Sequence, residues 1–469
     1  MKRLLATLAL LLLVASPASA ATLTVGPGMT YSTIAAAAAA ASAGDVVEIS
    51  AGTYHEEVVW SDDALTIRGV GGEVVVDMTG RALTNQGGKG IFILDGADIT
   101  VEGITFVGAS VPDGNGAGIR WQGGGMLTVR GCTFRDNEDG ILGGNHPDNV
   151  ALVEDNEFVG NGLGSFGYTH SIYVSEIDTL TFRGNWSHDL AAGPDIGHLF
   201  KSRAHHNYVL YNRLTAQGSH SSYELQLPEG GIGYVIGNLI EQGSMGPNRT
   251  IISIGGDGMQ WPDHHVFVVN NTIVNADTGG TFVNATAPID LDLVNNLFVG
   301  PGTVVSGGNV LRMSNNLTTD TSALVDAASF DYHLAPGSMA IDMGIDPGSD
   351  GAMSLAPVLQ YLHPRATEGR SAVGPIDVGA YEFGSVAVPD AGTDAGTGPG
   401  NDAGTIPGTD AAGTDAGASG RDAGASVPGT AGGCCGVAGT RSTRGAWLAP
   451  LGALGVVMVR SRRRAARRG

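Results

Sequence analysis

Val268-Val269-Asn270-Asn271-Thr272-Ile273 decides the fold, because the same phrase returns along most of the chain. Each copy has two or three alternating apolar residues, then Gly or Asn, then Asn or its substitute before another apolar residue, as in Leu293-Val294-Asn295-Asn296-Leu297-Phe298. The marker position that Asn271 occupies here recurs at 104, 132, 156, 185, 212, 238, 296 and 315. Successive markers lie 19 to 33 residues apart, which is the period of a solenoid.

The alternation inside each copy has period two, which indicates a β-strand. No helical run of ten residues separates the copies, and this excludes an α/β barrel or a doubly wound sheet. The sequence therefore predicts an all-β solenoid: a single-stranded parallel β-helix with one coil for each repeat. We expect the recurring Asn to take a left-handed backbone conformation at a bend, and its amide to bond to the Asn above and below.

Solenoids need caps at their ends. The alanine run Ala35 to Ala41 favours helix, so the sequence predicts a small N-terminal capping helix. At the other end, Asp331 to Ser338 and Asp377 to Glu382 are expected to close the last coil.

The chain divides into four parts. Residues 1–20 have a positive start, a short apolar run and Ala18-Ser19-Ala20, typical of a secretory signal peptide. The predicted β-helix occupies 21–388. Residues 389–430 repeat Asp-Ala-Gly and are predicted to form a disordered stalk, since they cannot bury enough apolar surface to offset their chain entropy. Residues 431–469 form a separate tail.

This tail runs from Cys434-Cys435 through the apolar stretch Ala446 to Val459 to an Arg-rich end. The apolar stretch is shorter than the ~17–25 residues of a usual transmembrane helix. The three-part layout resembles the myxobacterial C-terminal sorting signal, often called MYXO-CTERM. The resemblance implies export, contact with the membrane through the tail, and a final place at the cell surface or, after tail removal, in the medium. An ordinary membrane anchor is the alternative.

The net charge and the cysteine content limit the possible partners and the possible disulfides. The net charge of −21 argues against nucleic acid as a partner, which needs a basic footprint, but it suits Ca²⁺. Cys132 is alone in the body and is expected to be a buried apolar filler, so no disulfide framework is predicted.

Two phrases identify a broader family. Gly44-Asp45-Val46-Val47-Glu48-Ile49 with Gly52-Thr53-Tyr54 at the front, and Asp377-Val378-Gly379-Ala380-Tyr381-Glu382 at the back, resemble the pectate-lyase-like superfamily over residues 22–384. The resemblance implies a right-handed parallel β-helix and a polysaccharide partner. It does not imply one activity, because this fold hosts lyases, hydrolases, epimerases and inert adhesive shafts.

Candidate chemistry gathers between His170 and His220, where six of the twelve histidines lie. His198 is 14 residues before Asn212 and Glu224 is 14 before Asn238, so the two are expected to stack on neighbouring coils. The same count places Lys201 above Leu227. One face is therefore predicted to carry the catalytic candidates, which are His170, His198, Lys201, Arg203 and Glu224. Such a cationic strip on an acidic solenoid suits an acidic glycan.

Lys201-Ser202 also resembles a step in the chondroitinase B and alginate lyase family. This resemblance implies that Lys201 removes a proton next to a uronate carboxyl, with Ca²⁺ neutralising that carboxylate. Pro228 and Glu229 stand where the family has its helper Arg-His, and Asp195 is the nearest carboxylate before the lysine. The spacing of the histidines matches no fixed zinc pattern, and His205-His206 are interpreted as solvated.

The sequence thus leaves two functions open. One is a polysaccharide lyase-like enzyme that acts on an acidic glycan by β-elimination. The other is a non-catalytic surface module with a glycan-binding, adhesive or structural role. The substrate, the metal requirement and the oligomeric state are left open as well.

Overall fold

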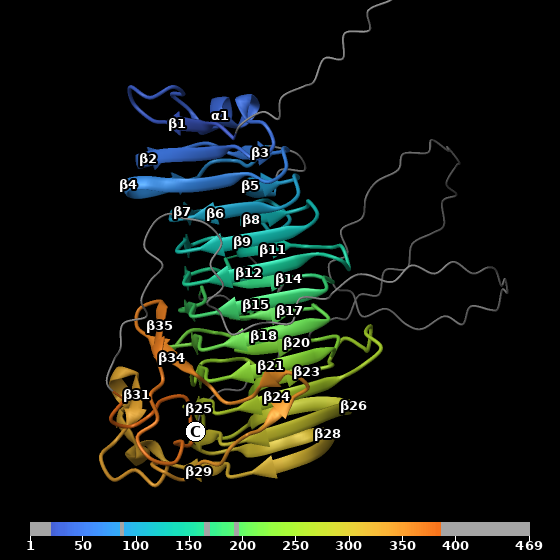
Figure 1. The fold of residues 1–469 in the computed structure, drawn as a ribbon, viewed down its shortest axis with the longest axis vertical. Helices are drawn as coiled ribbons and strands as arrows, with labels where there is room; N and C mark the ends of the chain where they lie inside the picture. Colours follow the sequence, from blue (N-terminus) through green and yellow to red (C-terminus); the bar gives the residue numbers. More distant parts are fainter. Residues whose placement is uncertain (1–19, 85–88, 164–168, 192–196, 386–469) are drawn as a thin grey trace, which may run out of the picture. The chain divides into compact units, whose positions relative to one another are not determined.

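The computed structural model describes residues 20–84, 89–163, 169–191 and 197–385. All of them belong to one compact unit, residues 1–421, and the second unit, residues 422–469, lies outside the described residues. The predicted signal peptide (apart from Ala20), stalk and tail also lie outside them. The described part is a right-handed parallel β-helix, as the fold prediction has it (Figure 1).

Each coil contributes a short strand to each of three ladders of parallel strands. The first ladder contains β3 (Val58–Trp60), β5 (Gly90–Leu94), β8 (Ala117–Trp121), β11 (Asp139–Gly143), β14 (Ile172–Val174), β17 (Lys201–Ser202), β20 (Leu225–Leu227), β23 (Thr250–Ile254) and the first halves of β26 (Thr281–Val294) and β28 (Thr303–Ser314). The second contains β1 (Thr22–Val25), β2 (Val46–Tyr54), β4 (Thr66–Asp77), β6 (Ile99–Glu102), β9 (Met126–Arg130), β12 (Val150–Glu154), β15 (Thr179–Arg183), β18 (His206–Leu210), β21 (Ile232–Ile236), β24 (His265–Val269) and the second halves of β26 and β28. The third begins with the second halves of β2 and β4 and continues with β7 (Ile104–Val107), β10 (Thr133–Arg135), β13 (Glu157–Val159), β16 (Trp186–His188), β19 (Arg213–Thr215), β22 (Leu239–Gln242), β25 (Thr272–Asn275), β27 (Leu297–Val299) and β29 (Leu317–Thr319).

The asparagines line up where the second ladder meets the third, as predicted. The ladder consists of Asn156, Asn185, Asn212, Asn238, Asn271, Asn296 and Asn316. In each step the Oδ1 of one Asn accepts from both the backbone N–H and the Nδ2 of the Asn before it, for example 3.0 and 3.1 Å from Asn185 to Asn212. All but Asn316 are fully or nearly fully buried, so these bonds satisfy amides that would otherwise be costly.

Two details of the ladder prediction are wrong. The last member is Asn316, because Asn315 instead bonds to the Met343 carbonyl. The left-handed residue is the one before each ladder Asn, as at Gly184 (φ 65°) and Asn270 (φ 50°). The bend at this preceding position turns the chain, so that the next side chain points into the coil.

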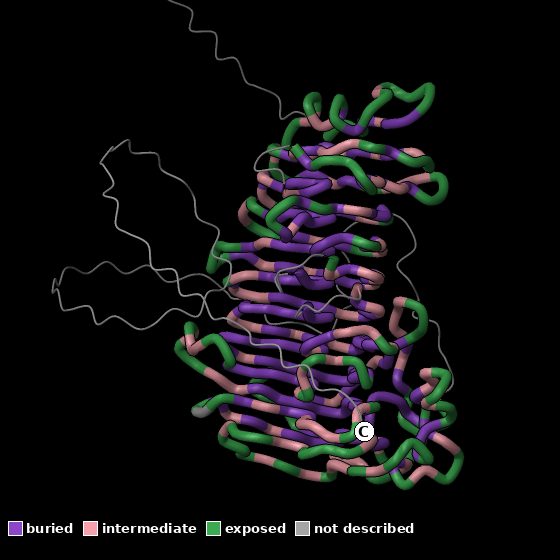
Figure 2. Tube along the Cα trace, turned by 180° about the vertical axis from the view of Figure 1, so that it is seen from behind, coloured by how far each residue is buried: buried purple, intermediate pink, exposed green. Residues whose placement is uncertain are grey.

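Apolar side chains fill the interior, which Figure 2 shows as the buried band along the strands. A column of rings runs through Phe92, Phe106, Phe134, Phe158 and Phe182, with neighbouring centroids 4.9 to 5.9 Å apart. Cys132 is fully buried, as expected, and burial raises the pKa of its thiol to about 12. Regular stacking of like side chains keeps the interior close-packed from coil to coil.

The N-terminal cap is confirmed. Helix α1 (Ile34–Ala40) begins after Thr33, whose side chain accepts from the Ala36 N–H at 3.2 Å. Ile34 and Ala37 are buried against the first coil.

The predicted closure at the other end is wrong. The C-terminal segment, residues 320–385, contains η2 (Thr321–Ala323), β30 (Leu324–Asp326), η3 (Ala327–Ser329), β31 (Asp331–Leu334), β32 (Ser349–Asp350), β33 (Met353–Ser354), β34 (Leu359–Leu362) and β35 (Ala366–Gly369). It lies along the flank of the coils instead of across their end (Figure 1). Its Gly379 N–H donates to the Asn295 carbonyl at 2.8 Å, and its Arg365 reaches the Cys132 carbonyl at 2.9 Å.

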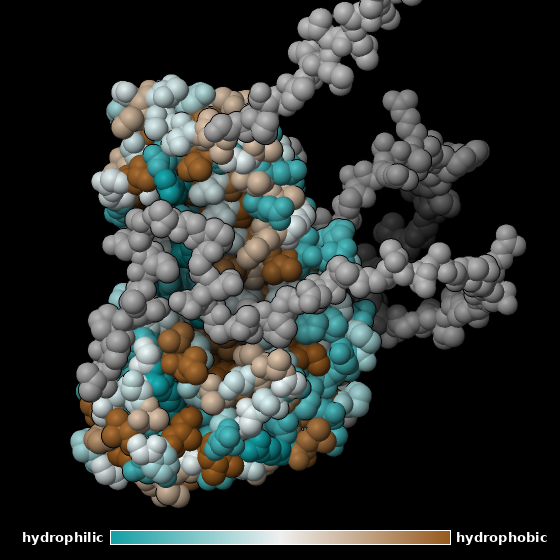
Figure 3. Space-filling view, viewed as in Figure 1, coloured by the Kyte–Doolittle hydropathy of each residue, from teal (hydrophilic) through white to brown (hydrophobic). Residues whose placement is uncertain are grey.

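Among the described residues, no segment covers the last coil, and Leu311 and Met313 are about half exposed there. Figure 3 shows hydrophobic side chains gathered over this lower part of the molecule. The segment anchors itself to the flank through a second apolar cluster that includes Leu297, Tyr332, Tyr361 and Val378.

Candidate functional site

The outer face of the first ladder brings most of the predicted site residues together. One column, given by strand register, runs through Arg120, Leu142, Tyr173, Lys201 and Gln226. Lys201 lies over the Tyr173 ring, with its Nζ 5.0 Å from the ring centroid. Because side chains alternate along a strand, these residues point outward while their neighbours fill the core.

A second column stands beside the first at the entry to these strands. It contains Asp139, His170, His198 and Tyr223. The ring centroids of His170 and His198 are 4.8 Å apart, and those of His198 and Tyr223 are 5.0 Å apart. The Asp139 carboxyl accepts from the His170 backbone N–H at 2.8 Å. His170 and His198 thus stack on neighbouring coils, close to Lys201.

Glu224 does not belong to this face, and its predicted stacking is wrong. His198 pairs with Tyr223, and Lys201 with Gln226 instead of Leu227. Glu224 therefore lies beside the core residue Leu199 and is fully buried. Burial, reinforced by Glu241, raises the pKa of Glu224 well above its usual range.

The register error arises from the connections between the ladders. Counting back from the asparagines assumes that every coil has the same number of residues between its first-ladder strand and its ladder Asn. The paired strands show that this number differs by one between these two coils. A shift of one residue moves a side chain to the opposite face of the sheet.

Arg203 lies at the edge of the same face and is enclosed by partners. Its Nε donates to the Tyr173 hydroxyl at 2.8 Å, and its Nη2 donates to Asp257 at 2.5 Å. Its Nη1 pairs with Glu229. Asp257 also lies 4.0 Å from the Lys201 ammonium, so the two cations share one carboxylate.

Burial controls the charge of the second column. Burial and then the positive charge of Lys201 lower the pKa of His198 to about 3. Burial also holds the pKa of His170 well below its usual range, with His198 and Lys201 as further causes. Burial raises the pKa of Asp139. Near neutral pH, both imidazoles are therefore uncharged and poor proton acceptors, and burial disfavours the charged form of the Asp139 carboxyl.

Two of the described acids near this face, Glu138 and Asp139, are poorly suited to bind Ca²⁺. The Glu138 carboxylate accepts from the Ser110 hydroxyl and from the backbone N–H groups of Val111 and Gly116. Asp139 is fully buried, and burial raises its pKa, which disfavours the charged form that a calcium ligand needs. Asp195 lies outside the described residues. The chemistry of this face therefore has to rest on its cations and hydrogen-bonding groups.

Sequence reasoning missed Arg120, Tyr173, Tyr223 and Gln226. The signal that could have found them is the alternation within the short first-ladder strands. Aligning Ile172-Tyr173-Val174, Phe200-Lys201-Ser202 and Leu225-Gln226-Leu227 on their apolar residues places Tyr173, Lys201 and Gln226 in one column.

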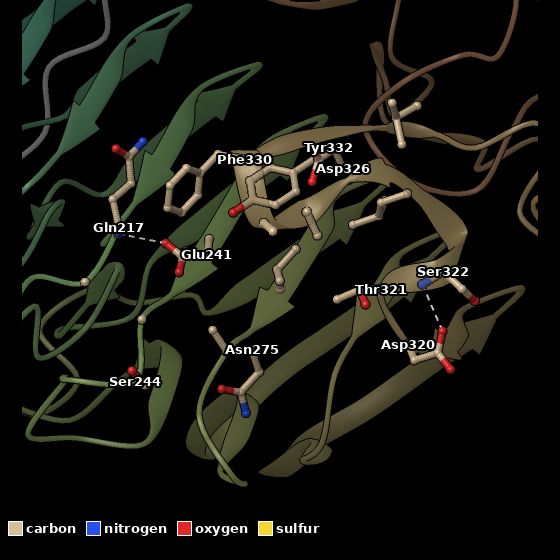
Figure 4. Close-up of a pocket in the computed structure, with 18 residues that line it drawn as sticks. Gln217, Glu241, Ser244, Asn275, Asp320, Thr321, Ser322, Asp326, Phe330 and Tyr332 are labelled. Carbon is tan, nitrogen blue, oxygen red and sulfur yellow. Dashed lines mark hydrogen bonds between the residues drawn. The ribbon is translucent and has the colours of Figure 1, made fainter.

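A separate groove of about 1020 Å³ lies between the third ladder and the C-terminal segment. Figure 4 shows Phe330 and Tyr332 on one side and Gln217, Glu241 and Asn275 on the other. Glu241 accepts from the Gln217 backbone N–H at 2.9 Å, and burial raises its pKa. The lining carries no lysine, arginine or histidine, so the groove lacks the mixed cationic and imidazole chemistry of the first-ladder face.

Comparisons with known proteins agree with the fold. Residues 63–238 match the family model described as a right-handed β-helix region. No curated protein matches the sequence. Solved structures similar to this chain include pectate lyase Pel9A, with 14% identity over 78% of this chain and 97% of the other, at a TM-score of 0.48. Pectin methylesterase from Aspergillus niger has 11% identity over 65% of this chain and 85% of the other, at a TM-score of 0.29. PemA, a pectin methylesterase from Erwinia chrysanthemi, has 12% identity over 54% and 79%, at a TM-score of 0.31.

In the part of the chain that the structure describes, no helix has the length and apolar character needed to cross a membrane. The predicted apolar stretch Ala446 to Val459 lies outside that part.

Proposed function

We propose that the outer face of the first ladder engages an acidic polysaccharide. The observation that carries the proposal is the set of cations on this face of a strongly acidic chain. Lys201 and Arg203 lie on one coil, and Arg120 lies in the same column three coils away. Positive charge on one face of an otherwise acidic solenoid suits the sign of an extended polyanion. The partly exposed Tyr223 ring adds a flat surface against which a sugar ring can pack.

We propose further that Lys201 acts as the base of a β-elimination. The two histidines are too weakly basic for this role, which leaves the Lys201 amine as the basic group at the centre of the column. The amine removes the proton next to the uronate carboxyl. The carbon–oxygen bond to the next sugar then breaks as a carbon–carbon double bond forms. In this proposal, the Tyr173 hydroxyl, which accepts from Arg203, protonates the departing oxygen.

Non-catalytic glycan binding is the second candidate, and one observation favours it. Glu229 and Asp257 both pair with Arg203, so its charge is largely balanced within the protein. An enolate-like intermediate needs a donor whose charge is directed at the substrate. A face that only holds the glycan has no such need.

The activity test uses the two lysines of the described residues as a matched pair. Lys201→Ala and Lys89→Ala are incubated with a panel of uronate polymers, and the near-ultraviolet absorbance of unsaturated sugar ends is followed. Lys89 forms an ion pair with Asp113 and is not part of either column. Elimination predicts signal from wild type and Lys89→Ala but none from Lys201→Ala. No signal from wild type on any polymer rejects the lyase.

Binding is tested separately by acetylation footprinting of the same two lysines. The Lys201 side chain is only 9% exposed, against 29% for Lys89, so slow acetylation of Lys201 is the expected baseline. A bound acidic glycan should slow acetylation of Lys201 further and leave Lys89 unchanged. Equal rates with and without every glycan would remove the proposed binding face, whether or not the chain is an enzyme.

Export and surface display are also proposed, because the signal-like start, the Asp-Ala-Gly stretch and the Cys-Cys, apolar and Arg-rich tail occur in the order that such delivery requires. A polysaccharide partner outside the cell is consistent with this order.

A further inference from the structure

A second cluster of polar side chains lies at the start of the second ladder, away from the two columns. Strand β15 pairs with β18 so that Thr179 stands opposite His206, which places Asp178 beside His205. The His205 and His206 backbone N–H groups donate to the Ile177 and Asp178 carbonyls at 2.9 and 2.8 Å. The coil register therefore brings a carboxylate from one coil to two adjacent imidazoles of the next.

We propose that Asp178, His205 and His206 bind a divalent transition-metal ion such as Zn²⁺. One ligand atom from each of the three lies within 4.8 Å of the other two. Zn²⁺ takes His nitrogen and carboxylate oxygen at roughly 2.0–2.2 Å, so ligand atoms around one ion lie roughly 3.5 Å apart. Closing the present spacing needs only small side-chain rotations, which these partly exposed side chains permit.

The chemistry of the donors selects the class of metal. Two imidazoles with one carboxylate suit Zn²⁺, Co²⁺, Ni²⁺ or Cu²⁺, whereas Ca²⁺ and Mg²⁺ prefer sets made only of oxygen. Among the described residues, this is the group of three or more His, Cys, Asp or Glu side chains that is close enough to share an ion.

Neighbouring residues already hold His205 in place. Asp263 lies 2.5 Å from its Nε2, which is the carboxylate–histidine arrangement that orients metal-ligating imidazoles. The Trp261 ring stacks on the His205 ring, with centroids 4.7 Å apart and planes at 12°. Asp263 and Trp261 therefore hold the His205 side chain in a defined orientation before a metal binds.

Trp261 also links the metal cluster to the cationic face. Its Nε1 donates to the Arg203 carbonyl at 3.0 Å, and the same loop carries Asp257, the carboxylate shared by Lys201 and Arg203. A metal bound at His205 fixes this loop at its far end. The site is thus a structural one that steadies a loop, and it does not depend on the proposed glycan chemistry.

The test uses the full chain without a histidine tag, stripped with a chelator and titrated with Co²⁺. Binding predicts one equivalent per chain, visible d–d absorption, and quenching of Trp261 fluorescence, because the indole stacks on a ligand. Zn²⁺ should displace Co²⁺, and millimolar Ca²⁺ should not. Loss of the quenching but not of the absorption in Trp261→Phe would confirm where the ion sits.

Variants separate the site from a surface ion pair. His206→Ala and Asp178→Asn should each weaken Co²⁺ binding by at least about tenfold, and Asp263→Asn by about 10- to 100-fold. His333→Ala is the control, since His333 is an exposed histidine that bonds to Asp331 elsewhere. Absence of stoichiometric binding, or equal affinity in His206→Ala and wild type, overturns the proposal.

Discussion

Replacing His198 by Gln should change the pH dependence of the free energy of unfolding. The size of the change follows from the lowered pKa of this buried ring. The folded pKa is about 3 and the ordinary value is 6.5. Between these values the unfolded chain binds a proton that the folded chain excludes, so the wild type loses stability as pH falls from 6.5 towards 3. From pH 7 to pH 5 this single group removes about 2 kcal/mol, provided its folded pKa is below 5.

His198→Gln lacks this group, so it should be less sensitive to acid than the wild type. The free-energy difference between wild type and variant should therefore shrink by about 2 kcal/mol between pH 7 and pH 5. Urea unfolding followed by far-ultraviolet circular dichroism measures both proteins at each pH. Taking the difference matters, because the buried acids Asp139 and Glu224 have raised pKa values and act in the opposite direction.

Phe200→Leu is the matched control. Phe200 is a fully buried, non-titrating residue two positions along the same coil, and its replacement costs packing energy equally at every pH. A constant difference between wild type and His198→Gln from pH 7 to pH 5 would show that His198 takes up a proton in the folded state. The neutral imidazole column, and the choice of Lys201 as base, would then be wrong.

Three further predictions concern the ladder, the interior and the tail. Asn212→Ala removes the side chain that bonds to Asn185, Phe182 and Asn238, and it should lower the free energy of unfolding by about 3 kcal/mol. Asn309→Ala, at an exposed position, should lower it by less than about 0.5 kcal/mol. Equal losses in urea titrations would contradict the role of the ladder. Glu224→Gln should gain stability relative to the wild type as pH rises above 4.5, by up to about 1.4 kcal/mol per pH unit. The reason is that the buried wild-type carboxyl has a raised pKa and keeps a proton that the unfolded chain releases. A gain independent of pH would mean that this acid is ionised in the fold. Deleting residues 431–469 should release the protein into the medium of an exporting host, measured by immunoblotting of cell and medium fractions; retention on the cells would place the anchor elsewhere.

The repeat was sufficient to predict the architecture, because one feature, the buried Asn, recurs for a physical reason that the sequence displays. Each ladder Asn bonds to the equivalent Asn on the next coil, so every coil needs one Asn at this position. The spacing of these asparagines in the sequence therefore gives the length of each coil. The capping helix could also be predicted, because its alanine run favours helix whatever surrounds it. Two positions were misplaced by one residue. The left-handed position was one, because both Asn and Gly tolerate that conformation, and the last ladder member was the other, because Asn315 and Asn316 are adjacent.

The site was harder to predict, since it depends on register between strands that the sequence does not tie together. His170 and His198 were found through their distance from the asparagines, but the same count put Glu224 on the wrong face. Tyr173 and Arg120 were missed because nothing in their local sequence differs from an ordinary strand. The flank position of the C-terminal segment could not be read either, since it rests on contacts such as Arg365 with the Cys132 carbonyl, more than two hundred residues apart.

That flank position has a mechanical consequence. The described residues end at Ser385, in a segment bonded sideways to Asn295 and, through Arg365, to a much earlier coil. Tension applied from the C-terminal side would first load these lateral bonds together, in shear, instead of peeling the open last coil one hydrogen bond at a time. A protein tethered by its C-terminus could thus withstand drag on a bound polymer without unwinding from the end nearest its tether.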